Sequence, residues 1–242
     1  MHRLNADTGE LEQFHDGQWQ PTPLTSLATP HIPRTTLLVD TQIRSIFADR
    51  ILPFYDGGPE PNKISRGLSS MGYDLTLARQ AKLKIPNGKA TIPYRPKSKK
   101  PNEFEEASVI DPKQPAMLRD FAPYDNYFVI PPHSQLLVSS EEYIRMPENV
   151  LGICLGKSTY ARSGILVNAT PLEPGWEGNL TMEIANLSSF SVKLYIGEGI
   201  CQILFFATNT TPERTYRHKQ SPYQGQTGVT PAMVRSLGDN NG

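Results

Sequence analysis

The chain has 242 residues, and its 24 Lys and Arg balance its 24 Asp and Glu, so the formal net charge is zero. This length suits one large domain or two small ones with an ample core, and the absence of a basic excess argues against nucleic-acid binding. No apolar run reaches the roughly 18 residues of a membrane helix, and the N-terminus lacks the apolar core of a secretory signal. We therefore expect a cytoplasmic protein.

Proline and glycine punctuate the whole chain, with 22 prolines and 18 glycines between short β-rich runs. This pattern predicts an all-β chain of many short strands with a few short helices. Cys154 and Cys201 both lie in apolar runs, which favours reduced packing residues over a disulfide. The five histidines show no metal-ligand spacing.

Residues 1–34 are expected to form an N-terminal extension. Leu4–Phe14 predicts a hairpin that turns at Asp7–Gly9, Asp16-Gly17 marks a second turn, and Pro21–Pro33 is typical of an extended linker. A disordered arm is the alternative for this extension. The main domain is then expected to span residues 35–242.

The main domain is expected to open with a helix. Helical periodicity runs over Leu37–Ile51, with Asp40 or Thr41 as the N-cap. A strand follows over Tyr73–Leu77, where a buried Asp74 would need a partner, for which Arg66 is the candidate. Residues 86–106 carry blocks of charge and predict an exposed insertion loop.

Further strands are predicted after the insertion. Phe128–Ile130 and Gln135–Val138 flank a proline turn, and Glu141–Met146 is expected to return along a sheet edge. Ile200–Phe206 predicts a strand buried on both faces, in which Gln202 must be hydrogen-bonded. Residues 210–235 are polar and glycine-rich, which is typical of a flexible terminus or of a lid over a site.

The segment from Gly156 to Glu183 contains the main candidate binding and catalytic residues. It is not a P-loop, because three residues rather than four separate Gly152 from Gly156, and because Gly164 leaves room for one or two helical turns at most. Lys157, Ser158 and Arg162 nevertheless offer donors suited to an anionic ligand.

A second feature of that segment is the strand expected around Glu183. Leu180, Met182 and Ile184 alternate on one face, which places Thr181 and Glu183 together on the other. A carboxylate beside an anion-binding loop suits a general base. From spacing alone, a solvated face residue is the commoner interpretation of such a glutamate.

Several motifs in order along the chain resemble the dCTP deaminase family, which is related to the trimeric dUTPases. They are the central segment together with Gly72–Asp74, Val138–Tyr143, Gly199–Phe205 and Tyr223–Gly228. The resemblance implies a dUTPase-like fold, a distorted β-barrel or jelly roll. It also implies a homotrimer with active sites between subunits that deaminates dCTP to dUTP and ammonia. Magnesium would be held by the triphosphate, and dTTP would be a feedback inhibitor.

The residues are compatible with a deaminase that uses no zinc. The His-x-Glu and Pro-Cys-x-x-Cys motifs of zinc deaminases are absent from the sequence. The resemblance makes Glu183 the general base, with Ser158 and Arg162 holding the water and the carboxylate. The nucleotide contacts that it implies are Lys157, Ser158, Thr159, Tyr160, Ala161, Arg162, Glu173, Thr181, Met182, Glu183, Gln202, Tyr216 and Gln226.

One departure and three functional hypotheses accompany the resemblance. Many family members have lysine where Pro222 stands, so a phosphate contact is lost unless Lys219 or Arg217 replaces it.

A monofunctional deaminase is one hypothesis. A bifunctional enzyme is the second, with Glu173 activating water at the α-phosphate to give dUMP and pyrophosphate. A nucleotide-binding trimer without turnover is the third.

Overall fold

The computed structural model describes residues 2–4, 11–21, 35–58, 60–84, 118–219 and 221–233. The chain divides into two compact units, Met1–Arg34 and Thr35–Gly242. The predicted 86–106 insertion lies outside the described residues, as do the linker from residue 22 to 33 and the Asp7–Gly9 turn.

The N-terminal unit contains a three-stranded antiparallel sheet. Its strands are β1 (His2–Leu4), β2 (Leu11–His15) and β3 (Gln18–Pro21), in that spatial order. The predicted turn at Asp16-Gly17 is confirmed, and both residues have positive φ angles of 48° and 82°. Phe14 and Trp19 pair across β2 and β3 with ring centroids 5.2 Å apart.

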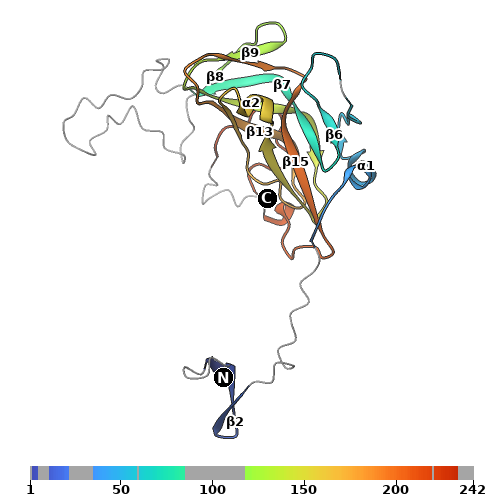
Figure 1. Cartoon of the computed structure of the whole chain (residues 1–242), viewed down its shortest axis with the longest axis vertical. Coiled ribbons are helices and arrows are strands. Elements are labelled where there is room, and N and C mark those ends of the chain that lie inside the picture. Colours follow the sequence, from blue (N-terminus) through green and yellow to red (C-terminus); the bar gives the residue numbers. More distant parts are fainter. Residues whose placement is uncertain are drawn as a thin grey trace, which may run out of the picture. The chain divides into compact units, whose positions relative to one another are not determined.

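The larger unit is built almost entirely of strands (Figure 1). The helical segments among its described residues are short: α1 (Asp40–Phe47), α2 (Ser158–Ala161) and the 3-10 turn η3 (Tyr216–Lys219). The strands are β4 (Thr35–Leu37), β5 (Ile51–Leu52), β6 (Gly67–Ser69), β7 (Gly72–Lys84), β8 (Leu118–Asp120), β9 (Tyr127–Ile130), β10 (Gln135–Arg145), β11 (Val150–Gly156), β12 (Ile165–Asn168), β13 (Glu177–Asn186), β14 (Val192–Tyr195) and β15 (Gly199–Thr208). The all-β prediction is confirmed.

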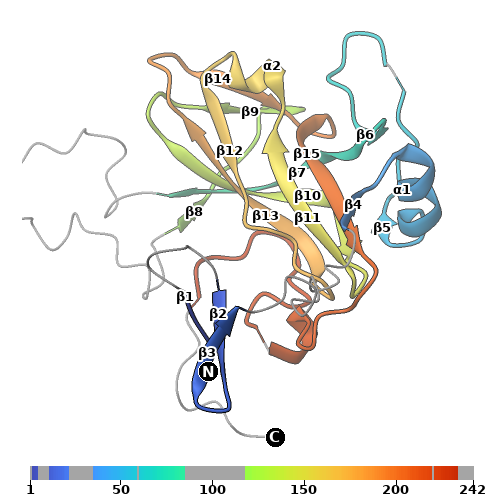
Figure 2. The same ribbon diagram turned by 60° about the horizontal axis from the view of Figure 1, so that its bottom comes forward.

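The main sheet follows the path β11-β15-β7-β10-β13-β12, with β4, β5, β6 and β8 pairing onto its members, while β14 pairs with β9. Neighbours along this path are antiparallel. Beyond β12 the chain returns to β11, where Gly152 and Leu172 exchange two backbone hydrogen bonds of 2.9 Å. The sheet therefore curls back on itself (Figure 2), which confirms the expected distorted barrel.

Helix α1 begins one residue earlier than the predicted caps imply. Val39 is the N-cap, and its N–H donates to Gln42 Oε1 over 3.1 Å, so Asp40 and Thr41 already lie inside the helix. Leu37 belongs to β4 rather than to the helix. The apolar face of α1 packs onto the barrel, where the rings of Phe47 and Phe205 stack at 4.2 Å.

Two strand predictions need correction. Glu141–Met146 does not return along an edge, because this part of the continuous strand β10 pairs with β5 on one side and with β13 on the other. Strand β15 is not buried on both faces, because Gln202, Leu204 and Phe206 are only half-buried while the alternating residues Cys201, Ile203 and Phe205 are buried. Both free cysteines are confirmed, and Cys201 is fully buried.

A glutamate lies inside the barrel wall where β7 and β10 meet. The side chain of Glu142 is fully buried. Its carboxyl group accepts hydrogen bonds from Thr76 N at 3.0 and 3.1 Å and from Thr76 Oγ1 at 2.9 Å. Burial raises the pKa of Glu142 to about 8, because removing the carboxylate from water penalises its charged form more than these bonds stabilise it.

Candidate active site

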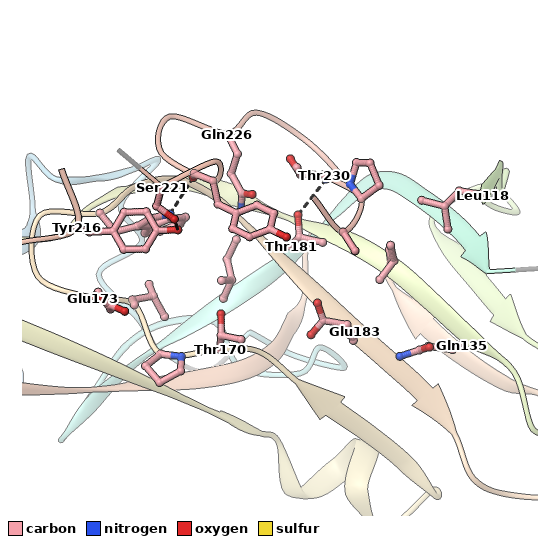
Figure 3. Close-up of a pocket in the computed structure, with 18 residues that line it drawn as sticks. Leu118, Gln135, Thr170, Glu173, Thr181, Glu183, Tyr216, Ser221, Gln226 and Thr230 are labelled. Atoms are coloured by element: carbon pink, nitrogen blue, oxygen red, sulfur yellow. Dashed lines mark hydrogen bonds between the residues drawn. The ribbon is translucent and has the colours of Figure 1, made fainter. Parts of the chain in front are cut away.

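A cavity of about 450 Å³ lies between β13, the loop after β12 and the C-terminal tail. The strand contributes Leu180, Thr181 and Glu183, and Gln135 and Leu137 of β10 lie beside them. Figure 3 shows that the labelled polar side chains come from several separate segments of the chain. The remaining lining residues are Leu118, Thr170, Pro171, Leu172, Glu173, Trp176, Tyr216, Ser221, Tyr223, Gln226, Thr230, Pro231 and Ala232. This size and this mixed lining suit a small-molecule site.

Glu183 presents its carboxylate to this cavity from the middle of β13 (Figure 3). The predicted alternation is confirmed, because Leu180, Met182 and Ile184 are buried while Thr181 and Glu183 are half-buried. Asn168 of β12 is the register partner of Glu183, and its Nδ2 donates to Glu183 Oε2 over 3.3 Å. The carboxylate thus accepts a hydrogen bond from a neutral amide and lines the cavity.

The C-terminal tail covers the cavity by pairing with β13. Asn179 N donates to Gln226 O over 2.9 Å, and Gln226 Nε2 donates back to Asn179 O over 2.7 Å. Further along, Thr230 N donates to Thr181 Oγ1 over 3.1 Å. The tail as far as residue 233 is therefore seated on the strand that carries Glu183.

A second acidic residue stands at the far end of the cavity. Glu173 forms an ion pair with Lys219, which comes from the 3-10 turn η3. Tyr216 of the same turn lines the cavity, and its hydroxyl oxygen accepts a 2.6 Å hydrogen bond from Ser221 Oγ. The ammonium group of Lys219 is thus paired with a carboxylate of the site. It does not stand unpaired as a replacement for the phosphate-binding lysine that many family members have where Pro222 stands.

The predicted turn from Lys157 to Arg162 does not line this cavity. It lies after β11, where α2 forms a single helical turn, within the limit of one or two turns that the sequence predicts. Gly164 ends this turn with φ +81°, and a Cβ there would be 2.8 Å from Ser188 Cβ. Within one chain, the structure groups Glu173, Thr181, Glu183, Tyr216 and Gln226, and it leaves Ser158, Thr159, Ala161 and Arg162 outside that group.

Comparison with known proteins shows the family to which the domain around this cavity belongs. A family model described as dCTP deaminase-like matches residues 38–208, which is most of the larger unit. The chain belongs to the dCTP deaminase-like family. It is 42% identical over 180 residues to a dCTP deaminase of Herpetosiphon aurantiacus, covering 74% of this chain and 88% of the relative. A dCTP deaminase of Erythrobacter litoralis is 41% identical over 196 residues, covering 80% and 97%.

A solved structure agrees with the family's fold. The chain matches a 2'-deoxycytidine 5'-triphosphate deaminase from Agrobacterium tumefaciens with a TM-score of 0.50 at 17% identity. The match covers 72% of this chain and 48% of that one, so this chain spans about half the length of that protein. This likeness supports the barrel architecture.

Three side chains that the family resemblance assigns to nucleotide contacts have structural roles here. Met182 is fully buried, with its Sδ 3.5 Å from Cys201 Sγ, so only its main chain can face a ligand. Tyr160 is buried as well, its hydroxyl accepts from Tyr195 N over 3.0 Å, and burial raises its pKa to about 12. Gln202 is half-buried and donates to Ser69 Oγ over 2.8 Å, which satisfies its amide as predicted.

The structure also reveals site residues that sequence reasoning missed. Asn168 binds the carboxylate of Glu183, and Asn179 anchors the tail through its main chain. Trp176 Nε1 donates to Tyr223 O over 3.0 Å and so helps to hold the tail. Contacts between segments far apart in the sequence bring these residues together: strand pairing for Asn168, and the seating of the tail for Asn179 and Trp176.

Neither a metal cluster nor a membrane helix is found in the described part of the chain. No group of three or more His, Cys, Asp or Glu residues there is arranged to hold a metal ion. No described helix has the length and apolarity to cross a membrane.

Gly178 is expected to control how the tail sits in this family member. Its φ is +148°, and a Cβ would lie 2.9 Å from Gln226 O and 3.1 Å from Gln226 N. Gly178→Ala should therefore strain the strand by about 1–3 kcal/mol and displace the tail. We expect limited proteolysis to cut residues 221–233 several-fold faster in this variant.

Gly197→Ala is the matched control for that experiment. Gly197 also has a positive φ, +71°, but no atom lies within 4 Å of the position that its Cβ would take. The control should carry backbone strain and leave the rate of tail cleavage unchanged. Equal cleavage rates in the two variants would contradict a specific contact between Gly178 and the tail.

Proposed function

We propose that the chain is a dCTP deaminase, which hydrolyses dCTP to dUTP and ammonia. The observation that carries this proposal is the carboxylate of Glu183, open to a nucleotide-sized cavity within a dCTP deaminase-like domain. The curated relatives that share over 40% of their residues with this chain bear the same name. Hydrolytic deamination needs a group that accepts a proton from water, and the carboxylate of Glu183, which Asn168 Nδ2 holds by a hydrogen bond, is a group of that kind.

The chemistry follows from the position of that carboxylate. Glu183 accepts a proton from a water molecule whose oxygen attacks carbon 4 of the cytosine ring. It passes this proton to ring nitrogen 3, then takes the second proton from the hydroxyl group now on carbon 4 and gives it to the amino group. The carbon–nitrogen bond breaks, ammonia leaves and the carbon 4 carbonyl forms. Thr181 lines the cavity from the same face of β13, which supports its proposed place beside the pyrimidine. The net reaction adds one water and removes one ammonia without any change in oxidation state.

Ser158 and Arg162 are proposed to enter the site from another subunit of a homotrimer. Support comes from their position outside the cavity of their own chain, which they do not line. Three exposed apolar side chains, Ile153, Leu155 and Leu166, lie on the neighbouring strands β11 and β12 and would be covered by assembly. Light scattering should give three times the mass of the chain, and a stable monomer would contradict the shared site.

A bifunctional reaction is the second candidate. Glu173 lines the same cavity and could activate water at the α-phosphate, which would release pyrophosphate and leave dUMP. Its ion pair with Lys219 lowers its availability as a base, and this favours the monofunctional enzyme.

The deciding experiment is product analysis with dCTP and Mg²⁺, with magnesium entering on the triphosphate as part of the substrate. We expect dUTP and ammonia to accumulate in equal amounts. Formation of dUMP and pyrophosphate would establish the bifunctional enzyme, whereas dCTP binding without any product would establish a nucleotide-binding protein. Chelation of Mg²⁺ should weaken turnover, and removal of zinc should not.

Feedback inhibition by dTTP is proposed for the same cavity, because dTTP shares the deoxyribose and triphosphate of dCTP. Added dTTP should raise the dCTP concentration needed for half-maximal rate. An unchanged dCTP saturation curve would rule out binding of dTTP at this site.

A further inference from the structure

A buried ion pair connects the Ser158–Arg162 turn to the barrel. Lys157 Nζ lies 2.6 Å from Asp74 Oδ2 and 3.0 Å from Ser65 Oγ. The side chains of Lys157 and Asp74 are only 13% and 5% exposed. The predicted partner Arg66 instead binds Glu60 Oε1 over 2.9 Å and Gly197 O over 3.2 Å. The expectation that Arg66 neutralises Asp74 is therefore wrong.

The side chain of Lys157 crosses a strand to make this contact. Lys157 follows β11 directly, Asp74 lies on β7, and β15 lies between those two strands. Gly199 leaves the room for the crossing: a Cβ there would be 3.2 Å from Lys157 Cδ and 1.9 Å from Ser65 O. The side chain of Lys157 thus extends across the width of β15, which brings its ammonium group to the carboxylate of Asp74.

The main chain of the same lysine starts the turn. Lys157 is the N-cap of α2, and its carbonyl oxygen accepts from Tyr160 N over 3.1 Å and from Ala161 N over 3.0 Å. No side chain caps this helical turn. A single turn has little stability of its own, so its placement depends on what holds Lys157.

Asp74 has few other donors. Its Oδ1 is buried without a hydrogen-bond partner among the described residues, and beyond Lys157 its Oδ2 is 3.4 Å from Ser65 Oγ. A buried carboxylate and a buried ammonium group each become costly when the other is removed. The pair therefore fixes Lys157 strongly at one position.

We propose that Asp74 is a positioning residue for deamination, which holds the Ser158–Arg162 turn in place through Lys157. In this arrangement Asp74 neutralises the charge of Lys157 and ties the residue that starts the turn to the barrel. The proposal rests on the proposed function for its effect on turnover. The mechanical coupling between Asp74 and the turn stands on the contacts alone.

The test compares Asp74→Asn, Lys157→Met and the double variant. Hydrogen exchange of the amides of residues 160–163 should become at least tenfold faster in all three, because the turn loses the same anchor in each. The kcat for dCTP should fall by about 10- to 100-fold in each single variant, as expected for a misplaced catalytic group. The double variant should lose no more than either single variant. Lys157→Arg should restore most of the protection and of the rate.

Asp56→Asn is the matched control. Asp56 pairs with Arg44 over 2.8 Å, but these side chains are 67% and 47% exposed, so the pair is not buried as that of Asp74 and Lys157 is. Exchange in residues 160–163 and kcat should be unchanged in this control.

Three results would overturn the proposal. The first is unchanged exchange in the turn of both single variants. The second is a double variant in which the fall in kcat equals the product of the falls in the two single variants. The third is an Asp74→Asn variant that keeps the wild-type kcat while Lys157→Met loses it, since that outcome uncouples Asp74 from the catalytic turn. If the wild-type chain does not turn over dCTP, the proposed function fails, while the exchange data still decide the coupling. If Asp74→Asn does not fold, Lys157→Met and Lys157→Arg carry the test.

Discussion

Replacing Glu183 with glutamine is expected to abolish ammonia release from dCTP. The amide keeps the shape of the side chain and its place in the cavity, but it cannot accept the proton of the attacking water. Removal of a general base of this kind lowers the rate by about 10²- to 10⁴-fold. Binding of dCTP, measured by calorimetry, should stay within a few-fold of the wild-type value.

Glu177→Gln is the control for this variant. Glu177 lies on the same strand but outside the cavity lining, and its Oε2 lies 3.8 Å from Arg145 Nε. This control should retain the wild-type rate. Full activity in Glu183→Gln would remove Glu183 from the mechanism. A parallel loss of dCTP binding would assign it to binding rather than to proton transfer.

A pH-dependent loss of stability is expected from Glu142. Because its pKa is raised from 4.5 to about 8 in the folded protein, the folded state keeps a proton that the unfolded state releases between those values. Stability contributed by this group should therefore be present at low pH and fall as the pH rises through that window. A difference of one in pKa corresponds to about 1.4 kcal/mol, so the loss of stability has an upper bound of about 5 kcal/mol.

Glu142→Gln should flatten this dependence. The amide is neutral at every pH and can still accept the bonds from Thr76. Above pH 8 the variant should unfold at a higher denaturant concentration than the wild type, and the two should converge near pH 5. The exposed Glu148→Gln serves as the control and should reproduce the wild-type slope. The wild type and Glu142→Gln are compared by the denaturant concentration at the unfolding midpoint. If this concentration does not fall for the wild type, relative to the variant, as the pH rises from 5 to 9, the buried carboxyl group is not protonated.

The sequence determined the local geometry of the site. The period of two along Leu180–Glu183 decides which side chains enter the core and which face the cavity, because successive residues of a strand point to opposite faces. In the same way, the short span before Gly164 limits the helix at Ser158 to one turn, because this glycine adopts a backbone conformation that ends helices. The ordered motifs added the family and the expected role of Glu183.

Only the tertiary structure decided which distant residues meet. The pairing of Asp74 with Lys157 rather than Arg66 depends on β15 lying between β7 and β11 and on the space at Gly199. The burial of Glu142 depends likewise on how β10 pairs with β7. Periodicity assigns a side chain to a face of its strand, but the register and order of strands assign its partners, and these come from pairings between residues far apart in the chain.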